Sequence, residues 1–334
     1  MTDSSLSSLT GPMMSALDAE LRRLVDELAD PRDGLHTMIC YAMGWSGAGA
    51  GAETTGKRIR PLLCLLSAGA AGGDWRAALP CSCAVEFIHS FSLIHDDIQD
   101  ESPLRRGRPS GWMQYGLPHA INVGDAIFAL AFTALAGGGA ADGCAVTRIL
   151  SATCLRLTTG QYLDLTYAKT DSISTGQYLL MIGGKTAALV AASCRLGSVS
   201  AEASPEKEEA FTAFGDALGM AFQIQDDYLG IWGDPFATGK SSGSDLLLRK
   251  KSLPILFGIS HSAAFRAMLT GELRGDSLAP LIAELEACGA REYTLSQVGE
   301  WTSRAFTALQ SASPQGEYGT ALEELARALL GRLR

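Results

Sequence analysis

The stretch SLIHDDIQDESPLRRGRP, from Ser92 to Pro109, places three aspartates and two adjacent arginines directly after an apolar run. Asp96 and Asp100 are four residues apart, so on a helix they lie on one face, roughly 6 Å apart along the axis. Like charges this close repel each other unless a positive charge lies nearby. Two hard carboxylates at this spacing suit Mg²⁺, which binds oxygen and shares its ligand shell with phosphates. Taken alone, the motif is equally typical of a solvated acidic helix end.

A second acidic stretch, FQIQDDYLGIWGD, also ends an apolar run with paired aspartates, Asp226 and Asp227. Gln223 precedes them by three and four residues, which places it on the same helix face. Two such helix ends facing each other would form a cage for several divalent ions. A chance pair of acidic helix ends is the competing interpretation.

Basic residues flank both acidic stretches, in GKRIRP, LRRGRP and GKSSGSDLLLRKKSLP. Arginine binds diphosphates as a planar fork and lysine binds them as a point charge. Each cluster alone is typical of a solvated surface. Together with the carboxylates they indicate two diphosphate pockets, one that binds through metal and one that binds through bare cations. The candidate residues are Lys57, Arg58, Arg60, Arg105, Arg106, Lys240 and Lys250.

The elements that must position these residues are helices. Apolar residues recur at three- and four-residue spacing in SALDAELRRLVDELAD, RPLLCLLSAGAA and FTAFGDALGMAFQIQDDYLGIW, and alternating strand patterns are absent. Pro61 marks a helix start, Gly72 a helix end, and STGQ (Ser174 to Gln177) is a capping box. No linker divides the chain, so we expect one all-α domain over residues 1–334.

Composition excludes several classes of protein. The 334 residues carry a net charge of −9, which argues against a protein that binds nucleic acid by neutralising phosphates. Eight cysteines without a CxxC pair indicate small core residues in a reducing cytosol, so we expect a cytoplasmic location. The longest apolar run, from Ala126 to Ala141, is shorter than the roughly 18 residues that a membrane span requires, and no signal peptide is evident.

In this order along the chain, the motifs resemble those of the trans-isoprenyl diphosphate synthases, the polyprenyl synthetase family. The resemblance extends from about Gly56 to Pro254 and is most like the geranylgeranyl diphosphate synthases. It rests on GKRIRP, EFIHSFSLIHDDIQD, LRRGRP, AINVGDAIFALAF, GQYLDL, KTAAL, FQIQDDYLG, GDPFATGK and KKSLP.

The resemblance implies an all-α, isoprenoid synthase-type helical bundle around a central cavity, usually in a homodimer. It implies that isopentenyl diphosphate condenses with an allylic diphosphate (dimethylallyl, geranyl or farnesyl) in a Mg²⁺-dependent reaction. Metal binding would fall to Asp96, Asp100 and Asp226, with Asp97 beside them. The allylic diphosphate would be bound by Arg105, Lys185, Lys240 and Lys250, and isopentenyl diphosphate by Lys57, Arg60, His89 and Arg106. The reacting centre would be lined by Thr186, Gln223 and Gln161, with Asp164 nearby.

The chain departs from the family pattern at one position of the second motif. Gly230 stands where the third aspartate is expected. We expect a metal site with one carboxylate fewer, for which Asp234 could compensate. The Gly- and Ser-rich stretch 239–243 is a candidate lid that excludes water.

Product length in this family depends on the residues before the first motif. Phe91 and Ser92 are the fifth and fourth residues before Asp96, and the motif has no insertion. This combination resembles a geranylgeranyl rather than a farnesyl diphosphate synthase, although Val123 and Ile127 could also set the floor of the cavity.

Three further kinds of protein are compatible with an aspartate-rich motif of this type. They are a class I terpene cyclase, a non-catalytic partner subunit of a synthase, and a synthase with an unusual acceptor. The cations of the second diphosphate pocket argue against a cyclase, which has no use for that pocket. The intact first motif argues against a non-catalytic subunit, although Gly230 keeps that interpretation open.

Overall fold

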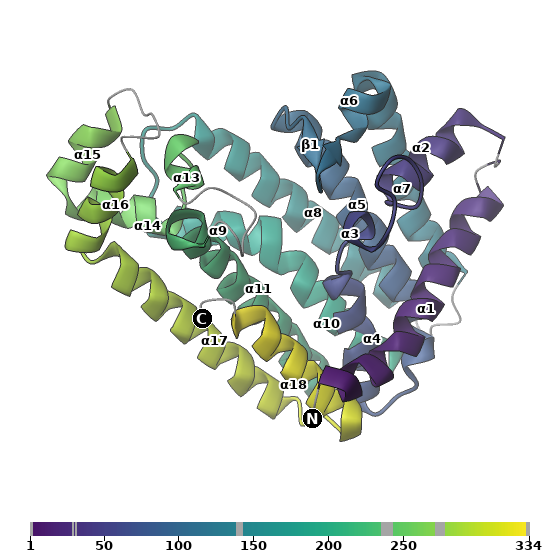
Figure 1. Cartoon of the computed structure of the whole chain (residues 1–334). Helices are drawn as coiled ribbons and strands as arrows, with labels where there is room; N and C mark the ends of the chain where they lie inside the picture. Colours follow the sequence, from purple (N-terminus) through teal and green to yellow (C-terminus); the bar gives the residue numbers. More distant parts are fainter. Residues whose placement is uncertain are drawn as a thin grey trace. The chain divides into compact units, whose positions relative to one another are not determined.

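The computed structural model describes residues 3–28, 30, 32–137, 143–234, 243–270 and 278–331, and these are mainly helical, which confirms the all-α prediction (Figure 1). The α-helices are α1 (Asp3–Leu28), α2 (Gly34–Ala42), α3 (Ala52–Thr55), α4 (Ile59–Ala71), α5 (Leu79–Gln99), α6 (Gly111–Tyr115), α7 (Leu117–Ala136), α8 (Gly143–Ala168), α9 (Thr175–Ile182), α10 (Ala188–Ser200), α11 (Pro205–Trp232), α13 (Ser244–Leu247), α14 (Leu253–His261), α15 (Ala263–Thr270), α16 (Leu278–Ala287), α17 (Ala290–Ser311) and α18 (Gly316–Leu330). A 3₁₀ turn covers Trp75–Ala78, a π-helical turn covers Gly183–Ala187, and two short strands are β1 (Leu104–Arg105) and β2 (Arg108–Pro109).

The chain divides into two compact units. Unit 1 contains Met1–Ala152, Ala192–Glu209 and Ala312–Leu322, and unit 2 contains Thr153–Ala191, Ala210–Ser311 and Glu323–Arg334. The first aspartate-rich motif lies in unit 1 and the second lies in unit 2. A single domain over residues 1–334 stays a prediction.

Unit 1 is built around α5 and α7, which lie side by side (Figure 1). Ile88 of α5 and Ile127 of α7 are fully buried. Gly124 allows α5 to approach, because a Cβ atom there would meet Nε2 of His95 at 2.3 Å. The predicted stop of α4 is confirmed, since Gly72 caps the helix with a φ of 104°, a left-handed conformation that favours glycine.

The loop after α5 contains a two-residue β-hairpin that the sequence pattern did not indicate. Arg105 pairs with Arg108 in the antiparallel strands β1 and β2. The two residues at the tip, Arg106 and Gly107, both have positive φ angles, 52° and 76°. A two-residue turn of type I′ requires positive φ at both central residues, and its twist matches that of the two flanking strands. The hairpin therefore presents the two adjacent arginines in different directions, one on a strand and one at the tip.

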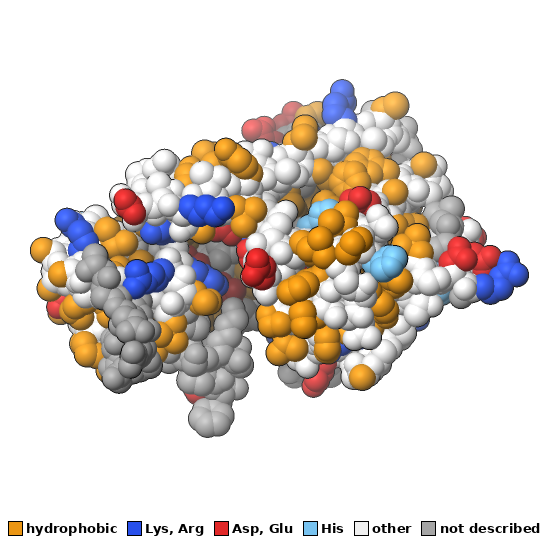
Figure 2. All heavy atoms as spheres, turned by 90° about the horizontal axis from the view of Figure 1, so that it is seen from above, with side chains coloured by type: hydrophobic (Ala, Val, Ile, Leu, Met, Phe, Trp, Pro, Cys, Tyr) orange, Lys and Arg blue, Asp and Glu red, His pale blue; other side chains and the backbone are white. Residues whose placement is uncertain are grey.

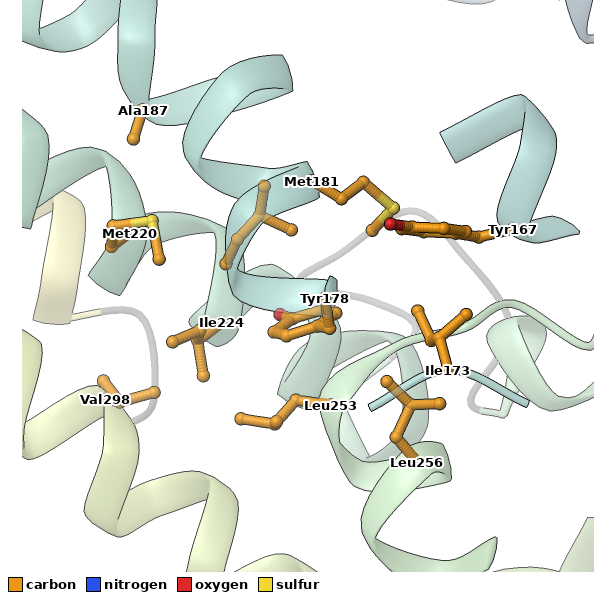
Figure 3. Close-up of a cluster of buried hydrophobic side chains, with 11 residues drawn as sticks. Tyr167, Ile173, Tyr178, Met181, Ala187, Met220, Ile224, Leu253, Leu256 and Val298 are labelled. Atoms are coloured by element: carbon orange, nitrogen blue, oxygen red, sulfur yellow. The ribbon is translucent and has the colours of Figure 1, made fainter. Parts of the chain in front are cut away.

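Unit 2 has a buried cluster that joins α9, α11 and α14, in which Tyr178, Ile224 and Leu253 lie together (Figure 3). The predicted capping box is confirmed, because the Ser174 hydroxyl accepts a hydrogen bond from the N–H of Gln177 while the Gln177 side chain accepts one from the N–H of Ser174. The helix expected to continue from there is interrupted by the π-helical turn. Such turns occur frequently at functional sites.

Three described helical segments are long and apolar enough to cross a membrane, judged by length and composition alone: Trp75–Gln99, Leu117–Ala136 and Thr175–Ser200. Each segment contains an apolar stretch of 18 residues, of which 56%, 44% and 72%, respectively, is buried inside the protein. Hydrophobic side chains also appear on the surface, in patches among charged groups (Figure 2). The absence of a membrane span therefore stays a prediction, as does a homodimer.

Candidate active site

The first acidic motif occupies the C-terminal end of α5. Asp96 lies in the last turn and Asp100 is the C-cap residue, and the last turn contains no basic residue. The C-terminal end of a helix carries partial negative charge, so carboxylates there are unfavourable without a cation. Asp96 keeps 22% of its side chain exposed and Asp100 is exposed. Both carboxylates therefore remain accessible to a metal ion or a substrate.

Asp97 points the other way and is paired within the protein. Only 5% of its side chain is exposed, and Nε of Arg105 donates to its two oxygens over 2.9 and 3.1 Å. Burial raises the pKa of Asp97, and hydrogen bonding by Arg105 opposes that shift. Nη2 of Arg105 also lies 3.7 Å from Asp96. Asp97 thus holds Arg105 beside the exposed carboxylates, where a diphosphate could meet both.

The hairpin tip brings Arg106 to the glycine-rich loop before α4. Nη1 of Arg106 donates to the carbonyl oxygen of Thr54 over 2.6 Å. A Cβ atom at Gly56 would meet Nη2 of Arg106 at 2.5 Å, so the guanidinium occupies the space that glycine leaves open. The motifs GKRIRP and LRRGRP, which are some 50 residues apart in the sequence, are therefore adjacent in unit 1.

Arg60 and His89 are also brought together, as the resemblance implied. Nη1 of Arg60 lies 3.4 Å from Nε2 of His89. Burial, together with the charges of Arg60, Arg106 and Arg105, lowers the pKa of His89 well below its usual range, so its imidazole is neutral at pH 7. Lys57 is exposed on the preceding loop. This group provides the concentration of positive charge that a second diphosphate requires.

Sequence reasoning missed the buried counter-charge of this basic group. Arg58 caps α4 with a φ of 46°; it pairs with Asp18, and its Nε lies 3.8 Å from Oε1 of Glu86. Burial raises the pKa of Glu86 to about 7, and Arg58, Arg106 and Arg60 oppose that shift. The available signal was a glutamate inside the apolar run AVEFIH. A buried carboxylate is either paired with a cation or held neutral.

The predicted chain-length residue Phe91 belongs to a row of rings between α5 and α7. Its ring centroid lies 4.6 Å from that of His95 and 4.9 Å from that of Phe128, and Phe128 lies 5.2 Å from Phe132. Phe128 was not among the residues expected to set the floor. In the sequence, Phe128 stands seven residues before Leu135 within the apolar pattern of α7. Ordinary core residues follow the same pattern, so the sequence did not mark Phe128 as a chain-length residue.

Ser92, Val123 and Ile127 were also considered as chain-length determinants. The Ser92 hydroxyl donates to the carbonyl oxygen of His89 over 2.8 Å, within its own helix. Val123 lines a cavity of about 50 Å³ together with Ser90 and Ile94. The role of Ser92 in chain length stays a prediction.

In unit 2, two glycines let α8 approach the π-helical turn backbone to backbone. A Cβ atom at Gly160 would meet the backbone nitrogen of Lys185 at 2.1 Å, and one at Gly184 would meet the Cα of Gly160 at 2.8 Å. Within this contact, Nζ of Lys185 forms an ion pair with Oδ2 of Asp164. Lys185, predicted to bind the allylic diphosphate, and Asp164, predicted to lie near the reacting centre, are therefore adjacent.

A chain of hydrogen bonds runs from the π-helical turn to the second acidic motif. The Thr186 hydroxyl donates to Oε1 of Gln223 over 2.7 Å, and Nε2 of Gln223 donates to Oδ1 of Asp227 over 3.1 Å. Asp227 also accepts from the Tyr178 hydroxyl over 2.7 Å and from the N–H of Leu253 over 3.0 Å. Burial raises the pKa of Asp227 to about 6 against these hydrogen bonds. Asp227 is thus a structural carboxylate that orients Gln223.

The remaining predicted residues of unit 2 have different environments. Asp226 and Gln161 are half-buried, on α11 and α8. Lys250 is exposed and its Nζ lies 3.2 Å from Oδ1 of Asp245. Lys240 and most of the candidate lid 239–243 lie outside the described residues.

The donors available for a metal are carboxylates with access to solvent. Within the described ranges, no three His, Cys, Asp or Glu side chains are grouped closely enough to hold a metal ion by themselves. Mg²⁺ is usually bound through one or two carboxylates plus substrate phosphates. The pair formed by Asp96 and Asp100, at the negative end of α5, fits such an ion better than it fits a closed structural site.

The chain was compared with known proteins. Residues 49–277 match the Polyprenyl synthetase family. A geranylgeranyl diphosphate synthase of Mycobacterium tuberculosis is 40% identical over 72% of this chain and 69% of its own length. A (2E,6E)-farnesyl diphosphate synthase of the same species is 38% identical over 80% of this chain and 77% of its own length.

A solved structure extends the likeness to the whole fold. The polyprenyl synthase from Caulobacter crescentus, crystallised with calcium and isoprenyl diphosphate, matches all of this chain and 98% of its own, with a TM-score of 0.81 and 30% identity. The fold and motifs define an all-α enzyme that acts on isoprenyl diphosphates. The chain belongs to the polyprenyl synthetase family and is a trans-prenyltransferase, an isoprenyl diphosphate synthase.

Proposed function

We propose that this enzyme condenses isopentenyl diphosphate with an allylic diphosphate in a Mg²⁺-dependent reaction and releases geranylgeranyl diphosphate. The observation that carries the proposal is the arrangement at the end of α5. There, Asp96 and Asp100 are accessible, while the buried Asp97 holds Arg105 beside them. The relative of known structure that was crystallised with calcium and isoprenyl diphosphate supports a divalent metal and this class of substrate.

In this proposal Asp96, Asp100 and Asp226 hold the metal ions, and Arg105, Lys185, Lys240 and Lys250 bind the allylic diphosphate. Bound Mg²⁺ would neutralise the negative charge that develops on the leaving diphosphate. Asp164 keeps Lys185 oriented through their ion pair. The residues of the chain thereby fix the leaving group before the allylic C–O bond breaks.

The hydroxyl of Thr186 and the amide of Gln223 are proposed to face the allylic cation, with Gln161 nearby. Their oxygen atoms carry partial negative charge, which stabilises a carbocation electrostatically as long as the side chains are held where they cannot bond to it. Lys57, Arg60, His89 and Arg106 are proposed to hold isopentenyl diphosphate, whose double bond attacks C1 of the cation. Proton loss to the departed diphosphate completes the reaction, so no enzyme nucleophile is required.

Geranylgeranyl diphosphate is proposed as the product because the ring of Phe91 and its partner Phe128 would stop chain growth. Farnesyl diphosphate is the second candidate, favoured by the relative named farnesyl diphosphate synthase at 38% identity.

A product assay tests the proposal. The purified chain is incubated with Mg²⁺, isopentenyl diphosphate and, in turn, dimethylallyl, geranyl or farnesyl diphosphate, and products are identified by mass. A dominant twenty-carbon linear diphosphate is expected. A fifteen-carbon or a much longer product would overturn the chain length. A cyclic hydrocarbon would overturn elongation in favour of a terpene cyclase, and the absence of turnover would favour a partner subunit.

Assembly and location are separate parts of the proposal. We propose a cytoplasmic homodimer, in line with the composition and with the resemblance. Sedimentation of the purified chain and fractionation of cells test the two statements independently.

A further inference from the structure

Arg108 connects the hairpin after α5 to a part of the chain that lies more than 60 residues earlier in the sequence. It belongs to β2, directly opposite Arg105 of β1. Nη1 of Arg108 donates to the carbonyl oxygen of Ser46 over 2.9 Å, and Nη2 donates to the carbonyl oxygen of Tyr41. Tyr41 lies near the end of α2 and Ser46 lies in the following loop. Arg108 therefore holds the hairpin against the loop that precedes α4.

Tyr41 reinforces this connection with its side chain. The guanidinium of Arg108 lies over the Tyr41 ring, 4.1 Å from its centroid, and the Tyr41 hydroxyl donates to the carbonyl oxygen of Pro109 over 2.7 Å. Only 6% of Tyr41 is exposed. Gly47, whose φ of 87° favours glycine, lies against the same ring, since a Cβ atom there would meet Cδ2 at 2.7 Å. Arg108 and Tyr41 thus form a clamp in which each residue fixes the other.

The clamped loop leads to the contact of Arg106, which is proposed to bind isopentenyl diphosphate. The Thr54 hydroxyl donates to the carbonyl oxygen of Gly44 over 3.1 Å, so the loop between them folds back on itself. The carbonyl oxygen of Thr54 accepts a hydrogen bond from Nη1 of Arg106 over 2.6 Å. The hairpin is therefore attached to the loop twice, through Arg108 near the start of the loop and through Arg106 near its end.

The two arginines next to each other in the hairpin depend on this loop to different extents. Arg105 is anchored by the buried Asp97, whose two oxygens accept from its Nε over 2.9 and 3.1 Å. The acceptor that the described chain provides for Arg106 is the loop carbonyl oxygen of Thr54. Its position therefore follows that of the loop, so loss of the clamp is expected to displace Arg106 rather than Arg105.

The contacts of Arg108 orient its side chain without neutralising its charge. Within the described part of the chain, the groups that accept hydrogen bonds from Arg108 are carbonyl oxygens. A planar guanidinium donates in fixed directions and stacks on an aromatic ring, whereas a lysine ammonium is a point charge on a flexible stem. Replacement of Arg108 by lysine therefore keeps the charge and removes the clamp.

We propose that Arg108, clamped on Tyr41, is a positioning residue that aligns Arg106 with the diphosphate of isopentenyl diphosphate. This inference rests on the proposed function, because it takes Arg106 as a ligand of that substrate. It gives the loop after α2 a role in substrate binding, since the loop carries the alignment from Arg108 to Arg106.

Steady-state kinetics of two Arg108 variants test the role. Arg108→Met and Arg108→Lys are each expected to raise the KM for isopentenyl diphosphate about tenfold, since neither side chain forms the clamp. The KM for the allylic diphosphate should change less than about threefold, because Arg105 stays paired with Asp97. A partly unfolded variant would lower the apparent kcat and leave both KM values unchanged. The split between the two KM values is therefore a result that a purely structural role would not produce.

Two further variants calibrate this measurement. Tyr41→Phe removes one hydrogen bond and keeps the ring under the guanidinium, so it should raise the KM for isopentenyl diphosphate only about threefold. Arg148→Met removes an arginine at an exposed position of α8 and is the matched control. It should change neither KM by more than about twofold. Thermal unfolding of every variant checks that the protein is folded.

A double variant tests whether Arg108 acts through Arg106. Calorimetry in EDTA measures the binding of inorganic pyrophosphate to the metal-free protein, which has only its own cations to offer. Arg106→Met and Arg108→Met are each expected to weaken this binding about tenfold. The combination Arg106→Met/Arg108→Met should be weaker than Arg106→Met by less than about twofold, because a positioning residue has no effect once its target is gone.

Four results would overturn the inference. They are a folded Arg108→Met protein with the parental KM for isopentenyl diphosphate, equal rises in both KM values, parental kinetics for Arg108→Lys, and fully additive losses in the double variant. Parental kinetics for Arg108→Lys would assign the effect to charge, and additive losses would show that Arg108 acts independently of Arg106. If the parent binds pyrophosphate but elongates no allylic diphosphate, the proposed function fails, while the calorimetric comparison still decides whether Arg108 positions Arg106.

Discussion

The hydroxyl of Thr186 donates a hydrogen bond to Oε1 of Gln223 over 2.7 Å, which joins the π-helical turn to α11. Because Nε2 of Gln223 donates to the buried Asp227, the amide is held with its oxygen toward Thr186. Tyr178 and the N–H of Leu253 fix Asp227 in turn. The orientation of one amide in unit 2 thus depends on a buried network that reaches the core cluster in Figure 3.

Replacement of Thr186 by Val removes the hydroxyl and keeps the shape of the side chain. We expect kcat to fall about 100-fold, at the lower end of the range found when one preorganised polar group at a reacting centre is lost. Thr186→Ser, which keeps the hydroxyl, should stay within about threefold of the parent. Single-turnover rates and thermal unfolding of both variants provide the measurement. A Thr186→Val protein with half the parental rate or more would remove Thr186 from the reacting centre.

Asp96→Asn is expected to lower kcat by at least two orders of magnitude and to raise the Mg²⁺ concentration required for half-maximal rate. The side chain is accessible and is proposed to bind metal, so the helix content and the midpoint of thermal unfolding should not change. Rates measured over a range of Mg²⁺ concentrations, with circular dichroism as the check, test this. Near-normal turnover would contradict the metal-binding role.

Asp97→Asn, one residue later, should behave differently. Its carboxylate is buried against Arg105, so the variant leaves a guanidinium with a weaker partner. We expect a loss of about 1–2 kcal/mol in the free energy of unfolding, less than for a fully buried pair because Arg105 is partly exposed. Urea unfolding of both aspartate variants gives the comparison. Equal stability of the two variants would show that the pair between Asp97 and Arg105 contributes little.

The parts of the fold that follow local rules were predictable from the sequence. The capping box at Ser174 and the stop at Gly72 depend on residues within one helical turn, and both are confirmed. The π-helical turn at Gly183–Ala187 was not foreseen, because its hydrogen-bond pattern leaves no periodic signal within so short a segment. It coincides with the close approach of Gly160 and Gly184, which is a tertiary contact.

In the candidate site, too, features that depend on neighbouring residues were predictable, whereas features that depend on tertiary packing were not. Asp96, Arg60 and His89 could be proposed as site residues because their motifs are contiguous, and the structure brings Arg60 and His89 together. The pairing of Arg58 with Glu86 and the contact between Gly230 and Asp245 join residues that are 28 and 15 positions apart. Spacing alone does not identify such pairs, because burial of a charge is decided by the packing around it.

Phe91→Ala is expected to lengthen the products, because the ring that would end the cavity is removed. Phe128→Ala should have the same direction, since its ring lies 4.9 Å from that of Phe91 and supports it. Phe132→Ala is the matched control, because among the described ring contacts Phe132 meets Phe128 and not Phe91. Product distributions identified by mass give the answer. Unchanged distributions for Phe91→Ala would remove Phe91 as the floor.

The buried Glu86 should give the free energy of unfolding a specific pH dependence. Burial raises its pKa to about 7, whereas a glutamate in an unfolded chain has a pKa of about 4.3. Between these values the folded protein binds a proton that the unfolded chain does not. The contribution of Glu86 to stability is therefore fully present below about pH 4.3 and is lost as the pH rises through about 7. The loss is on the order of 4 kcal/mol, at about 1.4 kcal/mol for each pKa unit.

Glu86→Gln removes this titration, because the amide resembles the protonated acid and keeps no ionisable group. The free energy of unfolding of the parent, relative to that of the variant, should decline from pH 4.5 to pH 7.5. Urea unfolding at several pH values measures the difference, and Glu209→Gln at an exposed position serves as the control. Parallel curves for the parent and Glu86→Gln would show that Arg58, Arg60 and Arg106 keep Glu86 ionised throughout, which would make it a permanent counter-charge of the basic group.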